Sequence, residues 1–271
     1  YYANRFLKPA GHYPTIETGT RHRAAQRFAN HAKCMVLALS QRRSSVTLYC
    51  HTRRYALNSV ETLVSRGTQI LQTLEKYVDT LRKTMHELTL RELGDIVTIF
   101  DVCRVLQRAE MVNRIRLEVD PILMELGIEG RLLELQMQET LIPLKEASMV
   151  VRDYYKERQG ITPDIIHERI AAISQEELMN LGSISQALGY GPNLRSVDSY
   201  MTPRGYRILH SINRLPSQRI DNLVDKLGSL HAIMSASREQ LVEVEGVGDV
   251  MAERIRGGIN LLTTQMAASG N

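Results

Sequence analysis

The stretch VEGVGDVMAERI, residues 244–255, decides how the last part of this chain folds. Gly246 and Gly248 stand one residue apart, between a short helical pattern at about 238–244 and a longer one that starts near Asp249. Glycine adopts positive φ without steric cost and lets a foreign backbone come close. The N–H groups that open the next helix carry the positive end of its dipole. The segment therefore predicts a seat for phosphate.

This arrangement is the helix-hairpin-helix pattern, which resembles modules that hold the sugar-phosphate backbone of DNA without reading its bases. A glycine-rich turn between two helices is often only a turn. Here the apolar Val247 between the glycines, with L-x-x-V before them and A-x-x-I after them, makes the pattern more selective. We expect DNA contacts from these residues: Gly246, Val247, Gly248, Asp249 and Arg254.

The segment LPSQRIDNLVDKLGSLHAIM, residues 215–234, precedes this pattern and resembles it. We expect it to be a degenerate partner, with Gly228 in its turn, that completes a four-helix unit over residues 200–271. This unit holds eight Lys and Arg residues against seven acids, a net charge of +1. So small a net charge indicates that one copy binds DNA weakly. Several copies in an oligomer would be needed to hold DNA firmly.

Residues 59–199 show long amphipathic helical patterns, with apolar residues at steps of three and four. We expect Pro121 and the segment 127–130 to be the main breaks, and Pro163 to begin a further helix. A stretch rich in Gly, Pro, Asn and Ser, residues 188–205, follows as a linker. The region predicts an all-α spine.

Residues 1–58 hold ten Lys and Arg residues and one acid, Glu17, whereas residues 59–199 hold sixteen against twenty-two acids. A basic surface that serves only solubility would be spread more evenly, so the concentration of charge indicates a polyanion partner. The region reads as a helix over 21–33, with Thr18 or Thr20 as its cap, and then two strands. The run 35–39 predicts a strand buried on both faces, and 46–50 predicts its neighbour.

The segment GTRHRAAQR, residues 19–27, places Arg21, His22 and Arg23 at the expected start of that helix. Adjacent cationic side chains repel one another unless an anion lies among them. The planar fork of an arginine matches phosphate oxygens. The sequence contains neither a Walker loop nor a dinucleotide fingerprint. A solvated basic helix end is the alternative interpretation, and a single histidine is more often structural than catalytic.

Composition excludes several classes of protein. Apolar residues make up 43% and charged residues 24%, as in soluble globular proteins. No stretch approaches the roughly 18 uncharged apolar residues of a membrane span. The three cysteines have neither metal-site spacing nor a disulfide framework, which fits a reducing cytoplasm.

Taken in order, a series of short motifs resembles one known family, the DNA-integrity scanning (DisA) diadenylate cyclases. The motifs are YAN, ETGTRHRAAQR, LSQRR, VTLY, RRYAL, QTLEKY, VLQRAEMVNRI, ISQALGY, PRGYRIL, RLP and VEGVGDVMAERI. The resemblance covers essentially the whole chain. It implies a partial α/β cyclase domain over 1–58, an all-α helical spine over 59–199 and a helix-hairpin-helix domain over 200–271.

The resemblance also implies an activity, namely the condensation of two ATP molecules into cyclic di-AMP with release of two pyrophosphates. It implies Mg²⁺ or Mn²⁺, cyclase domains that face each other in a homo-oligomer (an octamer), DNA as a partner, and a cytoplasmic, nucleoid-associated bacterial protein without a membrane. The phosphate contacts with a catalytic role would be Arg21, His22 and Arg23. The other expected ATP-binding residues are Leu7 against adenine, Gly19, Thr20 and Ser40, with Arg42 and Arg43 as looser candidates.

Two departures from the family pattern stand out. The family has an Asp-Gly-Ala motif shortly before YAN, and these 271 residues do not contain it. We therefore expect that this polypeptide does not make cyclic di-AMP, and that its first domain is incomplete. Gln26 stands where a glutamate is expected, and the effect should be minor.

Two other functions remain open on the sequence alone. A non-enzymatic DNA-binding scaffold would use the basic amino end and the helix-hairpin-helix unit as two contact surfaces. A repair nuclease or another nucleotidyltransferase would need clustered carboxylates near the basic segment, where Glu17 stands alone. Coupling of the two ends through the spine is a hypothesis, because a helical connection does not establish energetic coupling.

Overall fold

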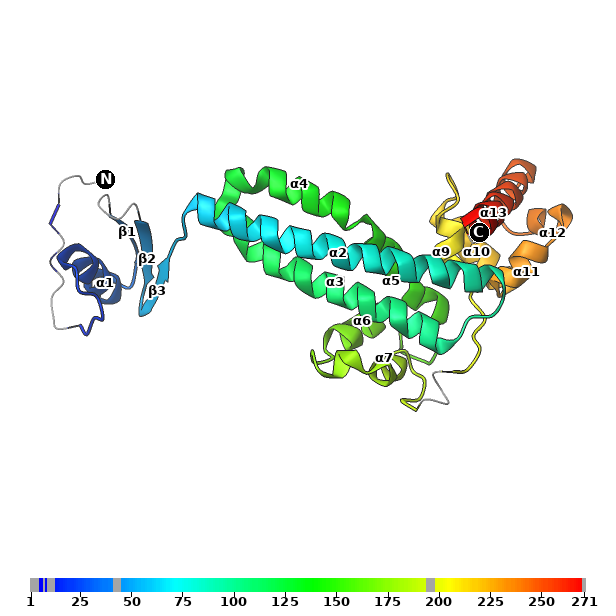
Figure 1. The fold of residues 1–271 in the computed structure, drawn as a ribbon, viewed down its shortest axis with the longest axis horizontal. Coiled ribbons are helices and arrows are strands. Elements are labelled where there is room, and N and C mark those ends of the chain that lie inside the picture. The colour runs from blue at the N-terminus through cyan, green and yellow to red at the C-terminus, as the bar shows by residue number, and fades with distance from the viewer. Residues whose placement is uncertain (1–4, 7, 9–12, 41–44, 194–197, 270–271) are drawn as a thin grey trace. The chain divides into compact units, whose positions relative to one another are not determined.

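The computed structural model describes residues 5–6, 8, 13–40, 45–193 and 198–269. The chain divides into two compact units, residues 1–69 with 119–134 and residues 70–118 with 135–271. The chain begins with a helix and a small sheet and is otherwise helical (Figure 1). The predicted order of a partial α/β region, a helical spine and a helix-hairpin-helix region is confirmed.

Residues 20–56, within the first unit, form one helix packed on a three-stranded antiparallel sheet. The elements are α1 (Thr20–Ala32), β1 (Met35–Ser40), β2 (Ser45–Cys50) and β3 (Arg53–Ala56), and the strand order is β1-β2-β3. Ala25 and Ala29 of α1 pack with Tyr49 of β2 as a small buried core, against which Val36 and Ala38 are half-buried. Small side chains on this face of α1 let the helix lie close to the sheet.

Two local predictions for this unit are wrong. β1 is not buried on both faces, because Met35, Leu37 and Leu39 are 63%, 54% and 70% exposed. Successive side chains of a strand point to opposite faces, and among the described residues only the face toward α1 is covered. Neither Thr18 nor Thr20 caps α1, since the N-cap is Gly19, which makes no side-chain bond.

The spine consists of long helices joined by short turns. Its elements are α2 (Val60–Leu93), α3 (Ile99–Leu126), η1 (Gly127–Gly130), α4 (Arg131–Thr140), α5 (Ile142–Tyr154), α6 (Pro163–Ala171), η2 (Glu177–Met179) and α7 (Leu181–Ala187). α3 continues through Pro121 and ends only before Gly127, which has φ 55°. Pro121 and Leu117, four residues earlier, are both exposed, so water can reach the carbonyl that lacks a donor. Pro163 begins α6, as predicted, and Thr162 caps it.

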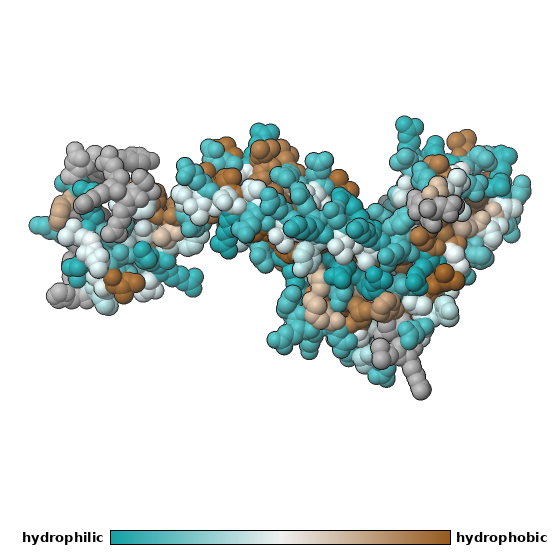
Figure 2. Space-filling model, viewed as in Figure 1, coloured by the Kyte–Doolittle hydropathy of each residue, from teal (hydrophilic) through white to brown (hydrophobic). Residues whose placement is uncertain are grey.

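In the second unit, α2 buries one stripe against α3, which runs beside it (Figure 1). Leu71, Leu74, Val78 and Leu81 of α2 are almost fully buried, at the spacing of a single helix face. An ion pair of 3.1 Å between Arg104 and Glu87 links the two helices at the surface. Hydrophilic residues cover most of the visible face in Figure 2, and hydrophobic residues gather over α4.

The helices of the carboxyl-terminal part of the second unit surround one apolar core. They are α9 (Tyr206–His210), α10 (Ser217–Leu227), α11 (Leu230–Ser235), α12 (Arg238–Val242) and α13 (Asp249–Ser269). The core includes Leu209, Ile220, Leu223, Leu241 and Ile255, all of which are fully buried. Each of these helices contributes to the core, so the region packs as one body.

A buried group of charges joins this body to the spine. Asp153, at the end of α5, accepts hydrogen bonds from the N–H groups of Gly205 (2.8 Å), Tyr206 (2.6 Å) and Arg207 (3.0 Å). Arg207 is only 2% exposed, and its guanidinium pairs with Glu92 of α2 and with Glu146 of α5, the latter at 2.9 Å. The carboxylate of Asp153 therefore caps α9 from another part of the fold.

The three cysteines are free thiols. No helix in the part of the chain that the structure describes is both long enough and apolar enough to cross a bilayer.

Candidate functional site

The cationic triplet, Arg21, His22 and Arg23, lies at the start of α1, and its three side chains have different surroundings. Arg21 is exposed, and its side chain has no partner among the described residues. His22 is half-buried, and its Nδ1 lies 3.0 Å from the hydroxyl of Tyr49 on β2. Arg23 reaches back to the carbonyl oxygens of Glu17 (3.4 Å) and Thr18 (3.5 Å). His22 thus anchors the triplet to the sheet while the arginines face outward.

Glu17, the only acid in residues 1–58, already has an ion-pair partner. The carboxylate of Glu17 pairs with Arg54 of β3 at 2.6 Å. Burial, followed by the nearby Glu17 carboxylate, raises the pKa of Tyr49 to about 12, with Arg54 acting in the opposite direction. Tyr49 is therefore a neutral partner for His22 at physiological pH. Arg21 and Arg23 are left without a carboxylate partner among the described residues.

A hollow of about 490 Å³ opens beside the triplet, lined by Tyr13, Pro14, Thr15, Arg23 and Arg27. Arg27 follows Arg23 by one helical turn and donates to the carbonyl of Tyr13 at 3.2 Å. Two arginines line this hollow and no acid does. The first turn of α1 also lacks an acid, so the positive end of the helix dipole adds to the same field.

Gln26 is a buried structural residue. It is 7% exposed and accepts a hydrogen bond from the hydroxyl of Thr15, which in turn accepts from the N–H of Glu17 at 3.1 Å. Gln26 therefore fixes the segment that leads into the triplet. A glutamate could accept the same bond, which agrees with the expectation that the departure from the family pattern has little effect.

The other predicted ATP-binding residues divide into two groups. Gly19 and Thr20 lie at the start of α1 beside the triplet, whereas Ser40 ends β1 opposite Ser45 and shares no hydrogen bond with the triplet among the described residues. The positions of Leu7, Arg42 and Arg43 lie outside the described residues. Sequence reasoning missed Tyr13, Arg27 and Tyr49, although the spacing of Arg27 from Arg23 was a usable signal.

The described residues do not form a metal site. No group of three or more His, Cys, Asp or Glu side chains is placed to hold an ion anywhere in the ranges that the structure covers. Glu17, the carboxylate nearest to the triplet, is committed to Arg54. The side chains of the described residues therefore do not supply the ligands that a divalent metal ion bound by the protein alone would need.

The predicted DNA-binding hairpin joins α12 to α13. Gly246 has φ 77°, Val247 is buried with 3% exposure, and the N–H of Val247 closes the turn on the carbonyl of Val244 at 3.0 Å. Asp249 opens α13 and pairs with Arg238 at 2.7 Å. Val247 therefore anchors the turn in the core, and the two glycines on either side lie outside it.

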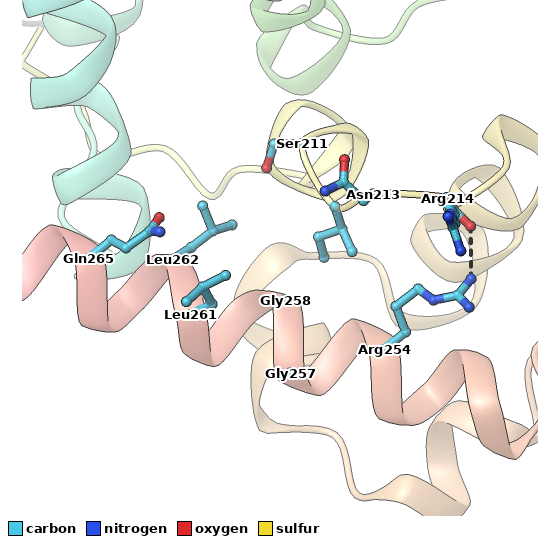
Figure 3. Close-up of a pocket in the computed structure, with 10 residues that line it drawn as sticks. Ser211, Asn213, Arg214, Arg254, Gly257, Gly258, Leu261, Leu262 and Gln265 are labelled. Atoms are coloured by element: carbon cyan, nitrogen blue, oxygen red, sulfur yellow. Dashed lines mark hydrogen bonds between the residues drawn. The ribbon is translucent and has the colours of Figure 1, made fainter.

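Arg254 lies at a different turn from the one that the sequence indicated. Its Nη1 donates to the carbonyl of Arg214 at 3.1 Å, in the turn between α9 and α10 (Figure 3). A hollow of about 700 Å³ lies there, between residues 211–214 and one face of α13. In Figure 3 the apolar side chains of Leu261 and Leu262 project toward this hollow from α13.

Gly228 lies in the turn between the two helices of residues 215–234, as predicted, but this turn is not the equivalent of the glycine hairpin. Gly228 has φ 79° and ends α10, where its N–H bonds to the carbonyl of Val224. The turn equivalent to the glycine hairpin is residues 211–216, between α9 and α10. A glycine was the obvious sequence sign of a left-handed residue, but here that residue is Arg214, with φ 60°.

Comparisons with known proteins match all three regions. Residues 1–54 match the model described as DisA bacterial checkpoint controller nucleotide-binding, residues 57–197 match the DisA bacterial checkpoint controller linker region, and residues 229–257 match the helix-hairpin-helix motif. The DNA integrity scanning protein DisA of Clostridium tetani is 42% identical over 97% of this chain and 72% of its own length. The proteins of that name from Carboxydothermus hydrogenoformans and Acetivibrio thermocellus are 43% and 40% identical, over 75% and 74% of their lengths.

Proposed function

The chain belongs to the DisA family of bacterial checkpoint controllers, and we propose that it binds ATP at its basic amino end and DNA at its carboxyl end as part of a diadenylate cyclase. The nucleotide-binding and helix-hairpin-helix matches support these two activities at opposite ends of the sequence. The activity in question joins two ATP molecules into cyclic di-AMP.

One observation carries the ATP proposal. Glu17, the only acid in residues 1–58, is held by Arg54, so Arg21 and Arg23 have no carboxylate to neutralise them among the described residues. Charge-assisted bonds from arginine to phosphate are short and strong, and such bonds contribute about 1.5–3 kcal/mol each. A triphosphate supplies the negative charge that these two side chains lack.

The proposed chemistry needs positioning and charge stabilisation rather than a covalent intermediate. Each ribose 3′-oxygen attacks the α-phosphorus of the other nucleotide, and a pyrophosphate leaves from each. Two sites must face each other, so we propose a homo-oligomer with opposed nucleotide regions. Arg21 and Arg23 would bind the triphosphate oxygens, while Tyr49 holds His22 beside them.

Two features limit what these 271 residues do by themselves. The sequence contains no Asp-Gly-Ala, so we expect ATP binding without conversion to cyclic di-AMP. The family implies a divalent metal ion, Mg²⁺ or Mn²⁺, for which the described residues supply no ligand set. DNA as the second partner makes nucleoid association the expected location.

Thermal unfolding in the presence of ATP tests the nucleotide site. At about one hundred times its Kd, ATP should stabilise the region that binds it by about 2.7 kcal/mol. The double variant Arg21→Ala with Arg23→Ala should lose this stabilisation. Arg53→Ala is the matched control, because it removes an exposed charge from the same region and should respond to ATP like the parent. Equal stabilisation of all three proteins would contradict the proposal.

The same experiment separates the cyclase from a scaffold that uses its basic end to bind DNA. A scaffold predicts that duplex DNA and not ATP raises the unfolding temperature, and that the double variant loses this effect of DNA. Competition between ATP and DNA for residues 1–58 would also favour the scaffold. The net charge of +9 in this region suits either anion, so the choice depends on the nucleotide response.

A further inference from the structure

The carboxyl-terminal body, made of helices α9 to α13, contains an internal repeat with an offset of 32 residues. Core positions of α9 and α10 recur in α12 and α13 at that spacing. The equivalent pairs are Leu209 and Leu241, Ile212 and Val244, Leu215 and Val247, Ile220 and Ala252, Leu223 and Ile255, and Leu227 and Ile259. The body is therefore two copies of one helix-turn-helix element, although the family model for this motif covers only residues 229–257.

The turns of the two copies share their backbone geometry. Arg214, with φ 60°, stands where Gly246 stands, with φ 77°. The N–H of Ile212 bonds to the carbonyl of Leu209 at 3.1 Å, and the N–H of Val244 bonds to that of Leu241, also at 3.1 Å. Pro216 and Gly248, again 32 residues apart, each accept two N–H bonds from the helix that follows. Arg214 thus adopts a conformation that glycine takes freely and other residues rarely take.

Each turn is held by a side chain from the helix of the other copy. The amide of Asn222 in α10 donates to the carbonyl of Glu245 at 2.8 Å, and Arg254 in α13 donates to the carbonyl of Arg214 at 3.1 Å (Figure 3). Asn222 and Arg254 occupy equivalent positions, 32 residues apart. The two turns are therefore fixed to one another within the same body.

The charges of the two turns are opposite. Residues 212–219 contain Arg214 and Arg219 and no acid, whereas residues 244–251 contain Glu245 and Asp249 and no base. Neither arginine side chain has a hydrogen bond or ion pair with any described residue. The Arg219 guanidinium lies against Gly246, where it occupies the space that a Cβ would need. The glycine turn permits close approach of a backbone but brings no positive charge of its own.

We infer that the turn of residues 211–216 is a second contact with the DNA backbone, and that Arg214 and Arg219 supply the cations that the glycine turn lacks. The inference rests on the proposed DNA binding of this body and names the residues that carry it. Arg214 extends from the first turn, and Arg219 lies over the second, so the pair connects both turns to phosphates. The backbone of Arg214 is strained and its side chain has no partner among the described residues. Both features agree with a role in binding rather than in packing.

The salt dependence of duplex DNA binding tests this inference. Fluorescence anisotropy with the full chain, measured across a range of salt concentrations, gives the slope of log K against log salt. In B-DNA each neutralised phosphate adds about 0.9 to the magnitude of that slope. Arg214→Gly and Arg219→Gln should each weaken binding and decrease the magnitude by about 0.9, and the double variant should decrease it by about twice as much.

Two controls separate binding from folding and from net charge. Arg214→Gly keeps the backbone conformation and the carbonyl that Arg254 uses, so its unfolding temperature should equal or exceed that of the parent. Arg82→Gln removes the same charge from an exposed position on α2 and should leave the slope unchanged. If Arg82→Gln decreased the magnitude of the slope as much as Arg214→Gly does, the inference would be overturned.

The remaining outcomes are distinguishable. If the parent chain does not bind duplex DNA, the proposed DNA-binding function and this inference both fail. If the parent binds DNA but Arg214→Gly and Arg219→Gln keep its slope, only this inference fails, and the glycine turn alone is the contact. A shallower slope in both variants, with a folded Arg214→Gly protein, establishes the second contact.

Discussion

At the scale of single residues, Gly246 is required for its backbone conformation. Its φ of 77° is strained for any residue with a Cβ. The guanidinium of Arg219 lies where that Cβ would be, but it is the end of a flexible side chain and can move aside. Sequence reasoning found the need for positive φ, together with close approach by DNA. Arg214 shows the reverse case, since its left-handed conformation cannot be recognised from residue type.

Gly246→Ala should therefore lower the free energy of unfolding by at least about 1 kcal/mol, from backbone strain alone. Gly248→Ala is the matched control, because a Cβ at that position would have nothing within 4 Å and its φ is not in the left-handed region. Thermal or urea unfolding of the two variants measures the difference. Equal stabilities for both would show that the turn relaxes at no cost.

Residue patterns predicted the outward part of the proposed nucleotide site but not the residues that support it. Arg21 and Arg23 were recognised because adjacent cations at a helix start need an anion. Tyr49 and Glu17 acquire their roles through the pairing of β2 and β3, which brings Arg54 and Tyr49 side by side in register. Such a role depends on strand register, and no local pattern in the sequence reveals it.

At the scale of elements, α9 is too short to be stable alone. So short a helix does not form in isolation. α9 depends on Asp153, which accepts hydrogen bonds from three N–H groups at the start of this helix. Burial raises the pKa of Asp153 to about 7, helped by the charge of Glu92 and opposed by its backbone hydrogen bonds and by Arg207. The junction between spine and carboxyl-terminal body therefore includes a group that gains a proton near neutral pH.

This pKa gives a signed prediction for stability. The ordinary value is 3.8, so the native protein holds a proton between pH 3.8 and about 7 that the unfolded chain releases. The contribution of Asp153 to stability should therefore increase as the pH falls through 7. Asp153→Asn cannot titrate, so the parent should gain unfolding temperature relative to this variant below pH 7. A difference between the two proteins that does not change with pH would contradict the shifted pKa.

The helices were better predicted than the turns and the edge strand. Periods of three and four residues over many turns identified α2 and α3, and Pro163 marked the start of α6. The turn at Arg214 was missed because its neighbours, not its own residue type, hold the left-handed backbone. The burial of β1 was mispredicted because an apolar run does not say how many faces of a strand are covered.

At the scale of the whole molecule, the order of regions was predictable from the charge distribution and from linked motifs. A basic amino end, an acidic spine and a nearly neutral carboxyl end follow from counting residues. The resemblance to the DisA family is confirmed by the family models and by relatives at 40–43% identity over almost all of this chain.

The central claim is that the two arginines at the start of α1 bind the triphosphate of ATP. A crystal structure of this chain with a non-hydrolysable ATP analogue tests it most directly. The account predicts triphosphate oxygens within hydrogen-bond distance of both Arg21 and Arg23, with His22 still bonded to Tyr49. An analogue bound elsewhere, or a structure in which both arginines are paired with acidic side chains and no nucleotide is bound, would contradict it.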